Sequence, residues 1–257
     1  MSVQLAVADG VARLTLDRPD AGNALDPELA RALAERAAEL EARDDVRAVL
    51  LGASGRAFCV GGDLRFMATA RDDAERAVRA LATDFHAALE SLARLDAPVV
   101  VAVNGVAAGG GMSLAIAGDL VVAAASARFT MAYTAAGLSP DGGATWVLSR
   151  LVGVRRAVEL MLLNERIDAQ RALELGLVNR VVPDDELDAA ASALAAQLAA
   201  GPTRAYGEVK RLLRVAATTS FSEQLVEEAT TIGRMAGSPH GREGIAAFLE
   251  KRAPDFS

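Results

Sequence analysis

Apolar and polar residues alternate in two short segments at the start of the chain, residues 3–7 and 11–16, which flank Asp9-Gly10. Strict alternation is typical of a half-buried strand, because successive side chains of a strand point to opposite faces. Asp-Gly between two such segments favours a tight turn. The pattern therefore predicts that the chain opens with two antiparallel strands.

The pattern then changes to helices that alternate with strands. Asp26-Pro27 provides an N-cap and a first-turn proline for a helix, in which apolar residues recur up to Leu40, and residues 46–51 have the pattern of a buried strand. The same order continues with a helix over 73–95, a strand over 98–103, a helix over 110–117 and a strand over 120–124. Such alternation predicts right-handed crossover units and a largely buried sheet.

Beyond Val182 the pattern is helical throughout. Short breaks of Gly, Ser or Pro separate four segments, which are residues 184–199, 203–216, 221–235 and 240–251. This change divides the chain near Pro183 into an α/β core with the active site, residues 1–183, and a helical oligomerisation region, residues 184–257. Apolar stripes in the second region, which include Leu187, Leu194 and Leu198, are expected to need a partner surface.

Composition excludes several classes of function. The 257 residues carry 27 Lys plus Arg against 34 Asp plus Glu, and no basic run is interleaved with aromatic residues, which argues against a nucleic-acid partner. Cys59 is the only cysteine and the two histidines are far apart, which argues against a disulfide framework or a zinc site. Neither a membrane helix nor a secretory signal is expected. We therefore expect a cytoplasmic protein that uses carboxylates, hydroxyls or backbone groups for catalysis, without a metal.

Two glycine-containing turns each follow a buried strand and precede a helix. Residues 55–64 contain Gly61-Gly62-Asp63, and residues 103–113 contain Gly109-Gly110-Gly111. Glycines permit left-handed backbone and close approach of a ligand, and free amides at the start of a helix favour negative charge. Neither turn has the lysine or the spacing of a nucleotide-binding loop. The two turns could hold one oxyanion together, although glycines that only form tight turns would give the same pattern.

Several motifs occur in one order along nearly the whole chain. They are Arg18-Pro19 with Asn23-Ala24-Leu25, residues 57–63, Asn104-Gly105 with the following glycine triplet, Gly118-Asp119, residues 140–143, residues 172–182 and residues 243–252. In these motifs the sequence resembles the crotonase superfamily, also called the enoyl-CoA hydratase/isomerase family. The resemblance implies an α/β fold, a crotonase-type spiral of ββα units followed by a C-terminal helical trimerisation region. It also implies a homo-trimer or a dimer of trimers.

The resemblance further implies a ligand and the residues around it. The ligand would be an acyl-CoA, with coenzyme A as part of the thioester substrate and no permanently bound cofactor. The backbone amides of Gly62 and Gly110 would donate hydrogen bonds to the thioester oxygen. Three residues would lie near the coenzyme, namely Ala24, Ala57 and Cys59, and two would come from a neighbouring subunit, namely Phe248 and Lys251.

Three other polar residues at the implied site have structural interpretations. The thiol of Cys59 would be a packing group, because no cationic neighbour that would lower its pKa is evident. Asp63 and Asp119 fall where the resemblance places acids that cap or brace turns. None of the three is predicted to be catalytic.

The positions that decide the reaction depart from the hydratase pattern. Hydratases of this family carry two glutamates, one just after the glycine triplet and one further along, and here those places are Ser113 and Tyr133. General acid or base help contributes roughly 10²–10⁴-fold per group, so loss of both carboxylates argues against a standard hydratase. Ser113 would instead leave room for a bulky acyl group, and Tyr133 would position the substrate or polarise water.

Asp141 falls where some isomerases of the family place an acid that faces the acyl chain. The pattern is most similar to phenylacetate-pathway (1,2-epoxyphenylacetyl-CoA) isomerases and Δ3,Δ2-enoyl-CoA isomerases. One carboxylate is enough to carry a proton from the α carbon to the γ carbon, which predicts an enoyl-CoA isomerase. The alternatives are an N-cap role for Asp141 in a helix over 142–151, an atypical hydratase or acyl-CoA hydrolase, and a catalytically idle CoA-binding oligomer.

Overall fold

A mainly parallel six-stranded sheet forms the centre of the molecule, which a computed structural model describes over residues 2–256. In spatial order the strands are β1 (Val3–Ala8), β2 (Val11–Leu16), β3 (Ala48–Ala53), β5 (Val99–Val103), β7 (Leu120–Ala124) and β10 (Arg180–Val182). Only β1 and β2 pair antiparallel. Asp9 and Gly10 between them have φ of 51° and 75°, so the predicted hairpin is confirmed.

A second, smaller sheet was not predicted from the sequence. It consists of β4 (Ala57–Cys59), β6 (Val106–Ala108), β8 (Arg128–Thr130) and β9 (Ile167–Asp168). The first three strands run parallel, and β9 is antiparallel to β8. Each strand is too short for a period of two to show in the sequence. Because the carboxyl ends of parallel strands meet at one edge, this sheet places the segments after β4, β6 and β8 side by side.

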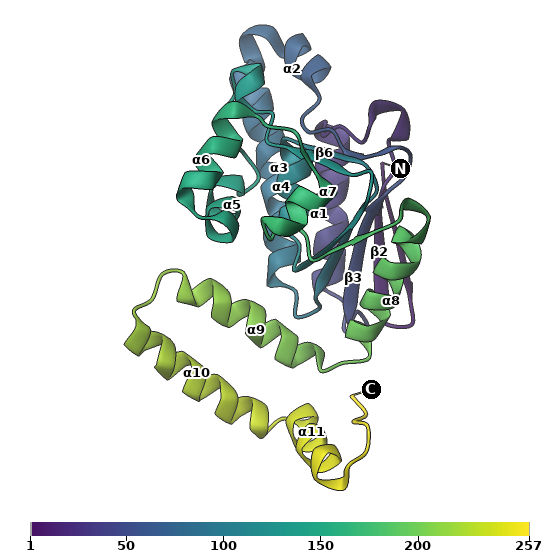
Figure 1. Cartoon of the computed structure of the whole chain (residues 1–257), viewed down its shortest axis with the longest axis vertical. Helices are drawn as coiled ribbons and strands as arrows, with labels where there is room; N and C mark the ends of the chain where they lie inside the picture. The colour runs from purple at the N-terminus through teal and green to yellow at the C-terminus, as the bar shows by residue number, and fades with distance from the viewer. Residues whose placement is uncertain (1, 257) are drawn as a thin grey trace.

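Helices pack against both sheets (Figure 1). In the first part of the chain they are α1 (Pro27–Glu41), α2 (Leu64–Ala70), α3 (Ala74–Arg94), α4 (Gly110–Ile116), α5 (Ala144–Val152), α6 (Val154–Leu163) and α7 (Ala169–Glu174), with short 3₁₀ turns η1 (Pro19–Ala21), η2 (Arg71–Asp73), η3 (Thr134–Ala136) and η4 (Asp184–Glu186). Asp26 accepts a hydrogen bond from the Leu29 N–H at 2.8 Å, which confirms the predicted N-cap of α1. Within residues 2–256, no helix is both long and apolar enough to cross a membrane.

The helix α8 (Leu187–Ala199) belongs to the core of its own chain. Leu187 and Leu194 are buried against Leu50, Val100 and Val122 of the large sheet, and Leu198 packs on the same cluster. The expectation that this stripe needs a partner surface in another subunit is therefore wrong for α8. The boundary expected near Pro183 precedes a helix that completes the core, and the helices that leave the core begin after α8.

The last three helices extend away from the core (Figure 1). They are α9 (Thr203–Ala216), α10 (Phe221–Ala236) and α11 (Pro239–Glu250). Lys210 anchors α9, because its Nζ lies 2.8 Å from Asp119 Oδ2 and 3.3 Å from the Leu92 carbonyl oxygen. Asp119 also accepts from the Val99 N–H at 2.7 Å, in agreement with its predicted bracing role. Arg214 adds a hydrogen bond to the Ala93 carbonyl oxygen.

We expect Lys210→Met to lower the free energy of unfolding by about 2–3 kcal/mol, because the Asp119 carboxylate would lose a buried partner. The Lys210 side chain is only 9% exposed, whereas the exposed fractions in the Arg13–Asp188 pair are 44% and 79%. Arg13→Met is therefore the matched control, with an expected loss of less than about 1 kcal/mol. Chemical denaturation of both variants measures the difference, and equal small losses would contradict the anchoring role of Lys210.

Candidate active site

The carboxyl ends of β4, β6 and β8 bring two glycine turns and Tyr133 together. Gly61 has φ of 96° and Gly109 has φ of 49°, a region that favours glycine. A Cβ atom on Gly61 would lie 2.8 Å from the Ala108 carbonyl oxygen, so the two turns approach each other too closely for a side chain. The predicted pairing of the two glycine turns is therefore present in the fold.

Leu25 lies between the two turns. Its N–H donates to the Gly61 carbonyl oxygen at 2.8 Å, and its own carbonyl oxygen accepts from the Asp63 N–H at 2.9 Å. Its Cδ1 lies 2.7 Å from the position that a Cβ would take on Gly110. Within the described residues, neither the Gly62 N–H nor the Gly110 N–H has a hydrogen-bond acceptor. Two unpaired amide donors therefore lie on either side of Leu25.

Polar residues before and within these turns brace the backbone. Asn23 is buried and donates through Nδ2 to the Ala57 carbonyl oxygen at 2.9 Å. Arg18 donates to the Ala24 carbonyl oxygen at 2.6 Å, so both Ala24 and Ala57 are held beside the first glycine turn. Asp63 caps α2 through the Arg65 and Phe66 N–H groups, as predicted for a structural acid.

Cys59 has the predicted packing role. Its side chain is fully buried, and burial raises the pKa of the thiol to about 12. Burial therefore favours the protonated thiol, in agreement with a packing role rather than a nucleophilic one. The Cys59 carbonyl oxygen lies 2.0 Å from a Cβ position on Gly111, so this strand also requires glycine in the second turn.

Ser113 and Tyr133 form a hydroxyl pair beneath Asp141. Their oxygens lie 2.8 Å apart, and they lie 2.9 Å and 3.1 Å from the main-chain carbonyl oxygen of Asp141. Burial raises the pKa of Tyr133 well above its ordinary range, so the phenol keeps its proton at neutral pH and can donate. The two residues at the hydratase positions thus hold the backbone of Asp141.

The Asp141 side chain contacts His86 of α3, which the sequence analysis did not identify. His86 Nε2 is hydrogen-bonded to Asp141 Oδ1. The Gly142 nitrogen lies 3.4 Å from Nε2 and can donate to it only when Nε2 carries no hydrogen, so the tautomer of His86 decides between the two contacts. Asp141 Oδ2 has no hydrogen-bond partner in the part of the chain that the structure describes. The alternative N-cap role is wrong, because α5 begins at Ala144 and has Gly143 as its N-cap without a side-chain hydrogen bond.

One apolar side chain packs near both Gly142, which follows Asp141, and the second glycine turn. The Cε1 atom of the buried Phe85 ring lies 3.8 Å from a Cβ position on Gly110 and 2.5 Å from one on Gly142. Gly142 and Gly143 both have positive φ, at 61° and 70°. Only Gly142 is closely packed, because nothing lies within 4 Å of a Cβ on Gly143.

This contrast gives a matched pair of variants. We expect Gly142→Ala to lower turnover about tenfold, because the added methyl group would meet Phe85 at 2.5 Å and Ser113 at 2.9 Å and would shift the adjacent Asp141. Small displacements of a reacting group are costly. Gly143→Ala carries a similar backbone cost of about 1 kcal/mol but no close contact, so its turnover should remain near that of the unchanged enzyme. Steady-state kinetics with both variants measures the effect. Equal turnover in the two would show that Asp141 placement does not depend on this packing.

Comparison with known proteins identifies the family. Residues 6–257 match the family model for enoyl-CoA hydratase/isomerase. This chain belongs to the enoyl-CoA hydratase/isomerase family. The resemblance and the crotonase fold predicted from the motifs are thereby confirmed.

Relatives within the enoyl-CoA hydratase/isomerase family are named for different reactions. The chain is 40% identical over 256 residues to a Rhodobacter capsulatus protein named "Probable enoyl-CoA hydratase", and covers 98% of that protein with 100% of its own length. It is 41% identical over 253 residues to the 1,2-epoxyphenylacetyl-CoA isomerase of Escherichia coli, with 98% of this chain and 96% of the relative covered. The solved structure of an enoyl-CoA hydratase from Polaromonas superimposes with a TM-score of 0.94 at 38% identity, over 98% of both chains. Identity alone does not choose between the reactions.

Two residues that the family resemblance placed at the site lie elsewhere in this chain. Phe248 and Lys251 are at the end of α11, at the opposite end of the molecule from α2 (Figure 1). The Phe248 side chain is 83% exposed. Within one subunit, Phe248 and Lys251 therefore do not lie near Asp141. Their role at the site of a neighbouring subunit stays a prediction.

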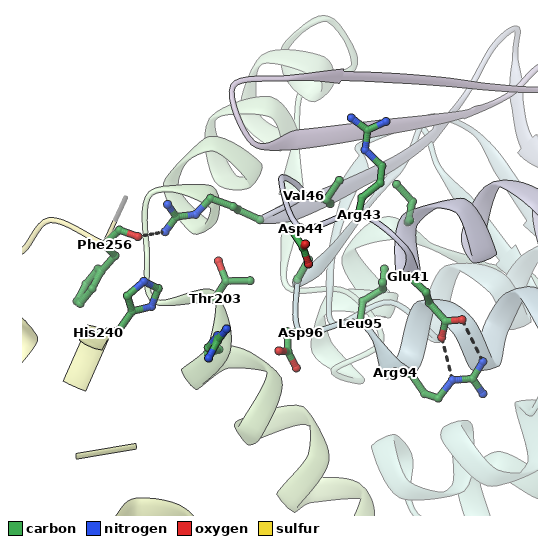
Figure 2. A pocket seen from close by; sticks show the side chains of 14 residues that line it. Glu41, Arg43, Asp44, Val46, Arg94, Leu95, Asp96, Thr203, His240 and Phe256 are labelled. Atoms are coloured by element: carbon green, nitrogen blue, oxygen red, sulfur yellow. Dashed lines mark hydrogen bonds and ion pairs between the residues drawn. The ribbon is translucent and has the colours of Figure 1, made fainter. Parts of the chain in front are cut away.

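A separate cleft of about 700 Å³ lies between the core and the last helices (Figure 2). Its charged groups include ion pairs and hydrogen bonds to the backbone, such as Arg94 with Glu41 at 2.8 Å and Arg47 with the Phe256 carbonyl oxygen at 2.6 Å. Neither the glycine turns nor Asp141 lines it. It is therefore distinct from the candidate active site. Within residues 2–256, no group of three or more His, Cys, Asp or Glu side chains could hold a metal ion.

Proposed function

We propose that this family member is an enoyl-CoA isomerase that moves a double bond by a proton shift through a thioester enolate. The observation that carries the proposal is the Asp141 carboxylate, which keeps Oδ2 without a partner among the described residues. The next residue, Gly142, packs against Phe85, and the same ring lies near Gly110. The hydratase positions hold Ser113 and Tyr133, whose hydroxyls bond the Asp141 backbone instead of offering carboxylates. One acid-base group suits a proton shift better than the addition of water.

The chemistry needs only these groups. Asp141 Oδ2 takes the proton from the α carbon of a 3-enoyl-CoA, and the electrons of that C–H bond move onto the thioester oxygen. The Gly62 and Gly110 amides donate hydrogen bonds to this oxygen and stabilise the enolate. The same carboxyl group then returns the proton to the γ carbon, and the double bond lies between the α and β carbons of the 2-enoyl product. Atoms and charge balance without another reactant.

The substrate carries coenzyme A as part of its thioester, and no other cofactor is needed. Ala24, Ala57 and the backbone at Cys59 adjoin the first glycine turn, which supports their assignment to coenzyme binding. Ser113 and Tyr133 adjoin the second glycine turn together with Phe85, which supports their assignment to binding of the acyl chain. Phe248 and Lys251 are assigned to the site of a neighbouring subunit.

A second candidate is addition of water, which one observation favours. Hydration needs a base for water and an acid for the α carbon, and His86 beside Asp141 gives the site two titratable groups. The pair could therefore replace the two glutamates of the hydratase pattern with other chemistry. Its product differs from that of isomerisation by one water molecule.

A panel of linear and aromatic 3-enoyl-CoA and 2-enoyl-CoA thioesters, read by product mass and NMR, tests both candidates. Isomerisation should convert a 3-enoyl thioester into a 2-enoyl thioester of the same mass. A product heavier by one water would replace the isomerase with an atypical hydratase, and free CoA would indicate a hydrolase. Tight binding without any conversion would instead support a catalytically idle CoA-binding oligomer.

We further propose a homo-trimer or a dimer of trimers. Large apolar side chains are exposed along the last three helices, namely Val209, Leu213, Phe221, Leu225, Val226, Ile232, Ile245, Phe248 and Leu249. Many large apolar side chains exposed on neighbouring helices are typical of an interface. Light scattering at micromolar concentration should give the mass of three or six chains, and a monomer would contradict both the assembly and the cross-subunit roles of Phe248 and Lys251.

A further inference from the structure

His86 occupies one oxygen of the Asp141 carboxylate and leaves the other available. Nε2 is hydrogen-bonded to Oδ1, whereas Oδ2 has no partner among residues 2–256. The main chain of Asp141 is fixed independently, because the Ser113 and Tyr133 hydroxyls lie 2.9 Å and 3.1 Å from its carbonyl oxygen. Because the main chain of Asp141 and its Oδ1 atom are both held by hydrogen bonds, the carboxyl group has little freedom to rotate.

The hydrogen bond from His86 can persist while Asp141 changes its protonation state. In the tautomer that carries its hydrogen on Nε2, this nitrogen donates to the carboxylate rather than accepting from the Gly142 N–H. It still donates to the carbonyl oxygen of the carboxylic acid after Oδ2 has taken up a proton. The bond therefore holds Oδ1 both before and after proton removal. Its loss would free the carboxyl group to turn about its Cβ–Cγ bond and exchange its two oxygens.

The solvent exposure of the side chains around Asp141 determines whether its bound proton can exchange with water. Phe85 is buried and forms the inner wall of the site, whereas the side chain of His86 is 47% exposed and that of Asp141 is 32% exposed. A thioester over Oδ2 would shield that oxygen, and His86 already covers Oδ1. With the substrate bound, both oxygens of Asp141 have a neighbour, so water has no oxygen through which to exchange the proton.

We propose that His86 is a positioning residue that holds Oδ1, so that the single oxygen Oδ2 removes the hydrogen from the α carbon and returns the same hydrogen to the γ carbon. The inference rests on the proposed function. In this proposal, His86 keeps the migrating hydrogen on the enzyme between the two steps. Neither the glycine turns nor the hydroxyl pair of Ser113 and Tyr133 has this role. In each turnover one C–H bond is broken and one is formed, and the proton stays on Oδ2 between the two steps.

The test is isomerisation of a 3-enoyl-CoA in deuterated water by the unchanged enzyme, His86→Gln and His86→Leu, with deuterium at the γ carbon of the product measured at low conversion. The glutamine amide nitrogen reaches about as far as Nε2 and can still donate to Oδ1, whereas leucine cannot. We expect little deuterium with the unchanged enzyme and with His86→Gln. His86→Leu should give several-fold more deuterium and about tenfold lower kcat, with KM nearly unchanged.

Equal deuterium content in the three proteins, whether high or low, would overturn the inference while leaving the isomerase assignment intact. An unchanged enzyme that forms no isomer would instead contradict the proposed function. The contact itself is tested in the free protein without any substrate, because the sequence contains only two histidines. Asp141→Asn should change the ¹⁵N resonances of His86 and leave those of His240 in place, and unchanged His86 resonances would show that the contact does not exist in solution.

Discussion

Replacement of Asp141 with Asn should lower kcat for double-bond migration by about 10²-fold or more, while Kd for a CoA thioester changes little. Asn has nearly the same volume and can still accept a hydrogen bond from His86, so the local packing should persist. An amide cannot take a proton from one carbon and return it to another. Steady-state kinetics on the best substrate of the panel, together with calorimetric measurement of thioester binding, would give both quantities.

Asp168→Asn is the matched control, because Asp168 is an Asp whose side chain caps a helix. It accepts from the Arg171 N–H at 2.8 Å at the start of α7, and Asn is an equally good cap. We therefore expect turnover near that of the unchanged enzyme. If Asp141→Asn also kept near-normal turnover, the acid-base assignment would be rejected, and Tyr133 would be the next group to test.

Replacement of Gly110 with Pro should depress turnover by about 10²-fold or more, because it deletes an amide hydrogen that, in the proposed mechanism, donates to the developing oxyanion. One such donor typically contributes roughly 3 kcal/mol to transition-state stabilisation. Gly110 is the first residue of α4, a position at which proline is compatible with a helix. Kinetics should be measured only after circular dichroism has shown that the variant is folded.

The variant Gly110→Ala is the control that distinguishes loss of the amide hydrogen from the effect of an added side chain. Any Cβ at this position meets Leu25 Cδ1 at 2.7 Å, so both variants disturb Leu25, but only proline removes the N–H. The additional loss in Gly110→Pro relative to Gly110→Ala measures the hydrogen bond. Equal turnover in the two folded variants would place the thioester oxygen away from Gly110.

The longer helices and strands could be predicted, because each contains enough residues to show its apolar pattern. The strand over 120–124 and the helix over 203–216 have the predicted bounds, since several apolar residues in each define one period. The second sheet could not be predicted, because strands of two or three residues contain no complete pattern. Its first two strands lie within segments that were interpreted as glycine turns.

The error in α8 has a different physical origin. An apolar stripe shows that a helix face is covered, but the stripe does not show which surface covers it. Leu194 packs on the sheet of its own chain, whereas α9, α10 and α11 carry exposed apolar residues. Only the course of the chain in space distinguishes a core helix from an interface helix.

At the site, the sequence predicted residue types better than it predicted pairs. The juxtaposition of the two glycine turns follows from neighbouring parallel strands, and Asp141 lies close to them. The contact between His86 and Asp141 spans 55 residues and depends on how α3 packs beneath the loop before α5. The sequence pattern predicted a helix over 73–95, but it gave no reason to join His86 to a distant aspartate.

The helix α3 also restricts how the length of this chain can vary. Near its middle it holds His86 at Asp141, and at its C-terminal end its carbonyl oxygens receive Lys210 and Arg214 of α9. Each residue added to a helix advances it by about 1.5 Å and turns it by about 100°, so one insertion between His86 and Leu92 would uncouple the two ends. Insertions and deletions among relatives should therefore fall before α3, around residues 70–74, and spare the segment between the site and the anchor of α9.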